Sequence, residues 1–377
     1  MMQRSSWSAM ARFTTRPRPR PTTRSVMPRH RMMRNLQSYL DEEFRKHPNE
    51  AMRLYDQKTI EEAFPHVLES QMKVRLASLT ASRSRTLKER AGYLDNIRNG
   101  TYLLWKEGLD RLEQFISLNL DWGTKLIQEV NSNGSPGEHL FSALIRNHSR
   151  ACLMAEEILH LLKGGFPDAA FARWRSLYEI AVTATFIRLR GEACAEAYLD
   201  HEIVDELKCH QLEQELEAAR GIKPPSDACT KDLETAFQEM LEKHGDSFKN
   251  PFGWASATLQ DKNPQFRDLE ARLDEEHGQE HMRVLYKRAS HKIHAAANGI
   301  STSLGTQSFG ANAPMLRAPS HEGLGMPGTL CAHSLCQTSM VITSLFTSAE
   351  SLIEMELFGR IVKGIDEAFG RALAVNP

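Results

Sequence analysis

The chain has 377 residues, of which 41% are hydrophobic and 25% are charged, a composition typical of a globular protein with a sizeable core. Its formal net charge of −1 hides an asymmetry. Residues 1–34 carry nine Arg and no acid, which leaves 38 basic and 48 acidic residues in the rest of the chain. An acidic body argues against broad, sequence-independent binding to nucleic acid.

The first 34 residues predict a disordered basic tail. They combine Arg with Ser, Thr, Pro and Met and lack an apolar stretch, which excludes an ordinary secretory signal. This tail has three interpretations: a transit peptide, a nucleic-acid-binding arm, or upstream sequence read from a wrongly chosen start. The last is favoured, because Met27, Met32 and Met33 offer later starts, so the tail need not belong to the native protein.

Cysteines and apolar runs indicate a cytoplasmic protein without a membrane anchor. The six Cys are scattered and include no Cys-x-x-Cys pair, as expected of small core residues in a reducing compartment. The uncharged run 329–349 is close to membrane length, but its many Ser and Thr favour a buried helix of a bundle.

Apolar residues recur at spacings of three and four in nearly every segment, which predicts an all-α multi-helix bundle. The predicted helices, in chain order, cover residues 35–48, 66–90, 92–130, 137–163, 167–190, 192–220, 226–243, 265–277, 280–299 and 329–374. We expect a charge-dense N-terminal helical region at 35–130, either a hairpin or a partner-binding arm, ahead of a core bundle at 137–374.

The predicted helix after Pro167 holds the most informative pattern. Arg175 and Glu179 lie four residues apart, so they can form an ion pair, and they fall within an otherwise apolar face. Burying charges is costly unless they are paired. The pair therefore either fixes the packing of the helix or binds a phosphate or carboxylate through the planar donors of Arg175.

Two further sets of side chains are candidates for a site. His201 and Asp205, also four residues apart, form either a solvated surface pair or a carboxylate-oriented imidazole. Tyr286, Ser290 and His294 follow one side of a later helix and border its apolar face. This second row either satisfies its own hydrogen bonds at the edge of the core or belongs to a site.

Several of these elements, taken in order, resemble the bacterial domain-of-unknown-function family 5677 over residues 140–350. The resemblance rests on Gly165-Phe166-Pro167-Asp168 leading into Arg175 and Glu179, then Tyr198 and His201, Phe252-Gly253-Trp254-Ala255, and Tyr286 with Ser290 and His294. It implies an all-helical bacterial protein of a family without an established activity. It also implies that Arg175, Glu179, His201, Trp254, Ser290 and His294 converge, and its analogy alone suggests a setting in stress or phage defence.

Two enzyme classes remain as alternatives. Arg288 and His294 have the Arg-x4-6-His spacing of the HEPN ribonucleases, which act without a metal, but Arg24 and His30 have the same spacing in the predicted disordered tail. On an unbroken helix Arg288 also projects about 120° away from His294, so that chemistry needs a broken helix or a second subunit. A di-metal bundle site is incomplete, since Glu157-x-x-His160 has no good second copy.

The sequence thus predicts a binding or interaction module with an internal polar cluster. The predicted binding residues are Arg175, Glu179, Tyr286 and Trp254, and the candidates for a catalytic role are His294, Ser290 and His201. No cofactor, metal or membrane is expected, while RNA or another phosphate-bearing ligand and a homodimer are left open as partners. A HEPN-like ribonuclease and a purely structural helical protein are the alternatives.

Overall fold

The computed structural model describes residues 45, 57–221, 227–277, 280–294, 299, 302–306 and 318–375. These residues form helices and short connections, and no strand occurs among them, which confirms the all-α prediction. The predicted disordered tail at 1–34 lies outside the described residues. So does the predicted helix at 35–48, apart from Arg45.

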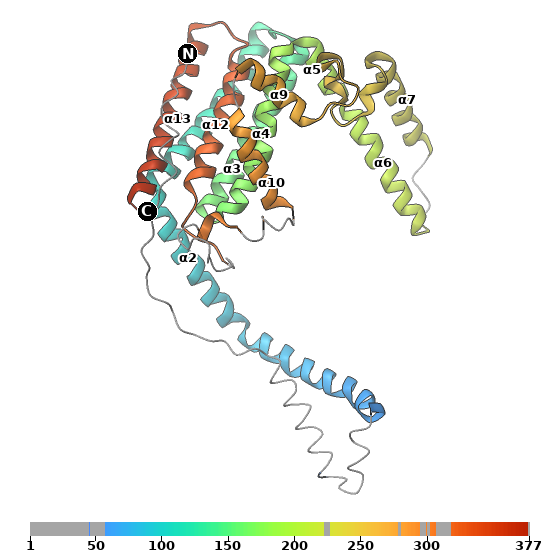
Figure 1. Ribbon diagram of the computed structural model, residues 1–377, viewed down its shortest axis with the longest axis vertical. Helices are drawn as coiled ribbons and strands as arrows, with labels where there is room; N and C mark the ends of the chain where they lie inside the picture. Colours follow the sequence, from blue (N-terminus) through green and yellow to red (C-terminus); the bar gives the residue numbers. More distant parts are fainter. Residues whose placement is uncertain are drawn as a thin grey trace. The chain divides into compact units, whose positions relative to one another are not determined.

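Figure 1 shows the order of the helices along the chain. Their bounds are α2 (Gln57–Asn133), α3 (Glu138–Lys163), α4 (Pro167–Arg190), α5 (Glu192–Asp200), α6 (Glu202–Ala219), α7 (Asp227–His244), α8 (Ser256–Leu259), α9 (Phe266–His277), α10 (Glu280–Ile293), α12 (Gly325–Thr343) and α13 (Ala349–Val375), with the 3-10 turns η2 (Asp246–Lys249) and η3 (Gly253–Ala255). The sequence predicted α4 correctly at both ends. It missed that residues 66–130 lie in one helix and that breaks near His201 and Ser344 divide two others.

The chain divides into two compact units, Met1–Asp95 and Asn96–Pro377. The sequence analysis placed a division at 130–137 instead. The reason for the difference lies in α2, whose residues from Trp105 to Leu126 bury an apolar face in the core of the second unit. In the first unit, by contrast, the apolar side chains of α2 from Leu68 to Leu87 are exposed.

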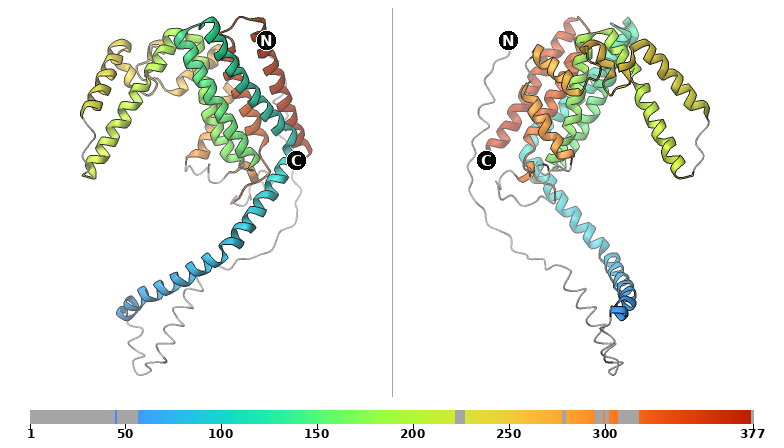
Figure 2. Two further views of the ribbon diagram at one scale, coloured as in Figure 1. Left: turned by 180° about the vertical axis from the view of Figure 1, so that it is seen from behind. Right: turned by 45° about the vertical axis from the view of Figure 1, so that its right-hand side comes forward.

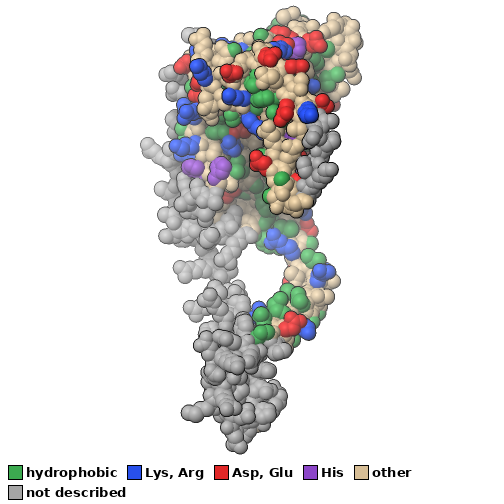
Figure 3. Space-filling model, turned by 90° about the vertical axis from the view of Figure 1, so that its right-hand side faces the viewer, with side chains coloured by type: hydrophobic (Ala, Val, Ile, Leu, Met, Phe, Trp, Pro, Cys, Tyr) green, Lys and Arg blue, Asp and Glu red, His purple; other side chains and the backbone are tan. Residues whose placement is uncertain are grey.

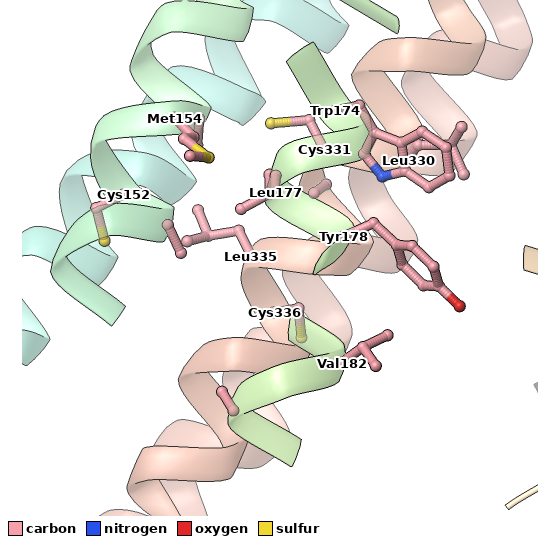
Figure 4. Close-up of a cluster of buried hydrophobic side chains, with 14 of the residues drawn as sticks. Cys152, Met154, Trp174, Leu177, Tyr178, Val182, Leu330, Cys331, Leu335 and Cys336 are labelled. Carbon is pink, nitrogen blue, oxygen red and sulfur yellow. The ribbon is translucent and has the colours of Figure 1, made fainter. Parts of the chain in front are cut away.

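The core of the second unit is a bundle in which α3, α4, α12 and α13 lie side by side (Figures 1 and 2). Helix α4 packs against both α3 and α12. Their apolar side chains meet in the cluster of Figure 4, which also contains Cys152, Cys331 and Cys336. Burial raises the pKa of all three thiols, so these cysteines act as small core residues, as predicted.

Helix α12 confirms the prediction of a buried, uncharged helix. Its hydroxyls satisfy polar groups of its neighbours inside the bundle. Trp122 of α2 donates to Thr343 over 2.8 Å, and Trp174 of α4 donates to Ser334 over 2.9 Å. In the part of the chain that the structure describes, no helix is both long and apolar enough for a membrane span.

The start of α4 is fixed by a tight turn and by a carboxylate. Gly165 adopts φ +78°, and its carbonyl accepts a hydrogen bond from the backbone of Ser320 over 2.8 Å. Pro167 then opens the helix, where its missing N–H costs nothing. Asp168 accepts from the hydroxyl of Ser303 over 2.6 Å and pairs with Lys292 at 3.1 Å. The turn thus ties α4 to two later segments of the chain.

We predict that Gly165→Ala destabilises the protein by about 2 kcal/mol or more, because Cβ adds a steric clash to an unfavourable positive φ. A Cβ at this position would lie 2.9 Å from the carbonyl oxygen of Ser320. Gly134, at φ +87° with no atom within 4 Å of a Cβ, is the matched control. Its Ala variant carries the backbone strain alone and should lose about 1 kcal/mol in urea unfolding. Equal losses for both variants would contradict the steric argument.

Candidate functional site

A polar network joins α4 to α10 at the predicted ion pair. The guanidinium of Arg175 lies 2.7 Å from the carboxylate of Glu179 and donates to the hydroxyl of Tyr286 over 2.8 Å. The same hydroxyl donates to Glu179 over 2.5 Å, and the guanidinium lies 5.0 Å from the centre of the Tyr286 ring. Burial and the bond to Glu179 raise the pKa of Tyr286 to about 12, so the phenol stays protonated as a donor.

A second tyrosine–glutamate pair extends this network onto α9. Tyr178, one residue before Glu179, donates to Glu270 over 2.9 Å, and its ring lies 5.8 Å from that of Tyr286. Figure 4 shows its hydroxyl at the far end of the ring from the helix axis, at the edge of the apolar cluster. Glu270 is buried, and desolvation raises the pKa of its carboxyl. Asp274 and Glu179 act on that pKa in the same direction.

The electrostatics of this network oppose the binding of an anion. Glu179 already neutralises Arg175, and the carboxylates of Glu270 and Asp274 add negative charge nearby, which Arg283 offsets only in part. Two surface hollows of the described residues lie elsewhere: one of about 480 Å³ along α7, and one of about 250 Å³ between α2 and α13. Among these residues, no group of three or more His, Cys, Asp and Glu is arranged to hold a metal ion. The network therefore favours fixing the seam between α4, α9 and α10 over holding a phosphate.

His201 lies at the junction of α5 and α6 and has partners of its own there. Its Nε2 is 2.8 Å from the carbonyl oxygen of Asn250, and its ring packs edge-on against Phe248 at 5.0 Å. The side chain is buried, and burial lowers the pKa of the imidazole. The expectation of a solvated surface pair with Asp205 is thus wrong, because the imidazole is buried and its Nε2 bonds to the carbonyl of Asn250, while the charge of Asp205 still acts to raise its pKa.

Trp254 belongs to a continuous series of aromatic contacts. It packs against Phe186 and Tyr198 at 5.8 and 5.2 Å between ring centres. Three successive ring contacts also link it to the polar network, with ring centres 5.1 to 6.5 Å apart: Trp254 with Phe252, Phe252 with Phe266, and Phe266 with Tyr286. The indole is buried, so Trp254 packs in the core of this region and does not line an open site.

The predicted row on α10 separates into three different environments. Tyr286 joins the network, Ser290 donates to the backbone carbonyl of Tyr286 over 3.0 Å, and the side chain of His294 is exposed. The backbone N–H of His294 still donates to Ser290, so α10 is unbroken up to this point and Arg288 projects to another side. Arg175, Glu179 and Tyr286 come together, whereas His201, Trp254 and His294 do not join them. Their functional roles stay predictions.

Sequence reasoning missed Tyr178, Glu270 and Phe266. Tyr178 carries a signal in hindsight, because it lies three residues after Arg175 and shares its side of α4. Glu270 offers none: it resembles the exposed acids around it on α9, and only the packing of α9 against α4 buries it. A single sequence gives no distance between helices so far apart along the chain.

The chain was compared with known protein families, curated proteins and solved structures. Residues 141–311 match the model of a family of unknown function, DUF5677. The match covers the polar network, the Gly-Phe-Pro-Asp turn and the aromatic series, which are the elements on which the resemblance was based. No curated protein and no solved structure gives a significant match to the chain. The DUF5677 region thus supports the fold and names no reaction.

We predict that Tyr286→Phe lowers the free energy of unfolding by about 1–2 kcal/mol, because Glu179 and Arg175 each lose a partner in a partly buried seam. A double-mutant cycle with Arg175→Met should give a coupling energy above about 0.5 kcal/mol. Tyr93→Phe, at an exposed ring of α2, is the control and should change stability little. Additive effects of the two substitutions in the seam would show that the contact contributes nothing.

Glu270 predicts a pH dependence of stability. Its folded pKa is raised above the ordinary value of 4.5, so the folded state binds the proton more strongly than the unfolded chain. Ionising the buried carboxyl therefore lowers the free energy of unfolding by a growing amount as the pH rises above 4.5. Glu270→Gln keeps an acceptor for Tyr178 and removes this cost, so its stability relative to wild type should improve from pH 4 to pH 7 in urea unfolding. Glu275→Gln, at an exposed acid on the same helix, should show no such trend.

Proposed function

We propose that this protein is a helical interaction module: its bundle is a rigid scaffold, and an exposed face of α2 binds a protein partner. One observation carries the proposal. Leu68, Met72, Leu76, Leu79 and Leu87 lie on one side of α2 within an arc of about 100°, and 42 to 66% of each side chain is exposed. A run of large apolar side chains on one face of a helix is typical of a protein-binding surface.

The charges on this surface indicate the chemistry of the partner. Residues 73–90 contain six basic side chains and one acid. Arg75, Arg83 and Arg90 lie on the same face as the leucines, close to or within their arc. We name this surface, with the five apolar residues above, the α2 strip. Arginines among leucines fit a protein surface that presents carboxylates between apolar groups, whereas a lipid interior would leave these cations without partners.

The polar network supports the scaffold half of the proposal. It connects three helices through short hydrogen bonds, and Arg175, Glu179 and Glu270 each have a partner within the seam, while Nε of Arg175 is buried without a hydrogen bond. Such a network fixes one packing arrangement at a cost in desolvation. These bonds hold α4, α9 and α10 in a single register. The binding chemistry is then carried by side chains outside the network.

A site-specific photo-crosslinker tests the proposed function in cells. With p-benzoylphenylalanine in place of Leu79, the full-length protein should give a discrete protein adduct whose partner peptide, identified by mass spectrometry, comes from an acidic surface. The same residue in place of Ser84, which is exposed on another side of α2, is the control and should give none. Adducts with lipid or RNA only, or no adduct at either position, would refute the proposal.

The ribonuclease alternative has its own test. An interaction module should not degrade RNA, so purified protein in the presence of a chelator should leave a single-stranded RNA intact, with no difference between wild type and His294→Ala. Degradation that His294→Ala abolishes, without a change in melting temperature, would instead favour a metal-independent ribonuclease with His294 as general base. Arg288→Ala should then reduce the cleavage as well.

A further inference from the structure

Helix α6 carries a surface whose side chains are the counterpart of the α2 strip. It contains six acidic residues and a single Lys. Its inner side is buried through Val204 and Leu207. The opposite side exposes Leu212 and Leu216, whose side chains are 64 and 52% accessible. Figure 3 shows the side of the molecule on which α6 and α7 lie, where acidic and basic side chains are interspersed over the surface.

The exposed leucines of α6 lie among carboxylates. On a helical wheel, Asp205, Glu206 and Glu213 fall within the same arc of about 120° as Leu212 and Leu216, and all three acids are exposed. We name this surface the α6 face. It interleaves leucines with acids, as the α2 strip interleaves leucines with arginines.

We propose that the partner of the α2 strip is the α6 face of a second copy of this chain, an inference that rests on the proposed function. Both surfaces are apolar, so their contact removes leucine side chains from water. Opposite charges flank the leucines on the two sides, so the carboxylates of α6 reach the arginines of α2. From Asp205 to Leu216 the α6 face extends over about 17 Å, which covers about half of the strip between Leu68 and Arg90.

Charge excludes the other self-associations of these helices. Two α2 strips in contact would place Arg75, Arg83 and Arg90 of one copy against the same three arginines of the other. Two α6 faces would bring three acids against three. Like charges at such contacts weaken association and select against the wrong pairing. A contact between unlike surfaces remains, and reciprocal exchange between two copies closes a dimer, whereas a one-way contact forms an open chain.

Charge reversal on purified full-length protein tests this contact. One variant combines Arg83→Glu with Arg90→Glu on the α2 strip, and the other combines Glu206→Lys with Glu213→Lys on the α6 face. By sedimentation velocity, wild type should associate at low micromolar concentration and weaken as NaCl rises from about 0.05 M to about 0.5 M. The association of each variant alone should be weaker than that of wild type by a factor of about ten or more. An equimolar mixture of the two should recover association, because each reversed surface then meets an opposite charge.

Matched controls separate a specific contact from net charge. Arg85→Glu with Lys88→Glu on α2 makes the same charge change away from the strip and should leave association unchanged. Glu215→Lys on α6 makes half the charge change of the double reversal away from the α6 face, and it should have no effect, whereas a net-charge effect would give half the loss. Circular dichroism melts of all variants should show that the fold is kept. A dye-labelled copy of one reversed variant, mixed with the other unlabelled, reports the mixed complex directly.

Three results would overturn the inference. They are a monomeric wild type, association that neither reversal weakens, and the absence of recovery in the mixture, which would show that the two surfaces do not pair between copies. Binding of wild type to vesicles of phosphatidylserine and phosphatidylcholine in place of self-association would also overturn it. If wild type is monomeric but the crosslinker at Leu79 still captures a different acidic protein, this inference fails while the proposed function stands.

Discussion

Helix α4 is enclosed by other helices, and this enclosure is the constraint on which the second unit depends. It packs against α3, α12, α10, α5 and α9, so few of its polar groups can be satisfied by water. Trp174 donates to α12, Tyr178 donates to α9, and Arg175 and Glu179 share the hydroxyl of Tyr286 on α10. Each of these hydrogen bonds thus joins α4 to one particular neighbouring helix. The hydrogen bonds specify which helix lies where, while the apolar side chains supply the driving force.

The family match acquires a physical meaning from this arrangement. It begins in α3 and ends at residue 311, so it includes α4 and the helices that satisfy its polar groups, except α12. The Gly165 turn and Asp168 lie at the start of α4 and hold Ser303 and Ser320. These bonds position the chain that leads to α12. The matched region is therefore a packing unit that α12 and the second half of α2 complete.

The sequence predicted most of the fold and part of the candidate site. Periodicity located nearly all of the described helices, and the Gly-Gly-Phe-Pro-Asp run placed the start of α4 at Pro167. Spacing also predicted the pair of Arg175 and Glu179, because i and i+4 neighbours meet on any helix. Contacts between distant helices could not be derived in this way. His201 shows why: its spacing to Asp205 suggested a local pair, but a carbonyl 49 residues away is the partner.

The distribution of the cysteines has a practical consequence for spectroscopy. Cys152, Cys194 and Cys336 are buried, and burial raises the pKa of their thiols to between about 11 and about 12, so the reactive thiolate is scarce at neutral pH. Cys331 is buried as well. Cys209 is exposed on α6, and the side chain of Cys229 lies outside the described residues. After Cys229→Ser, a maleimide fluorophore or nitroxide should label the folded protein at Cys209 alone, which supplies a native reporter position on α6.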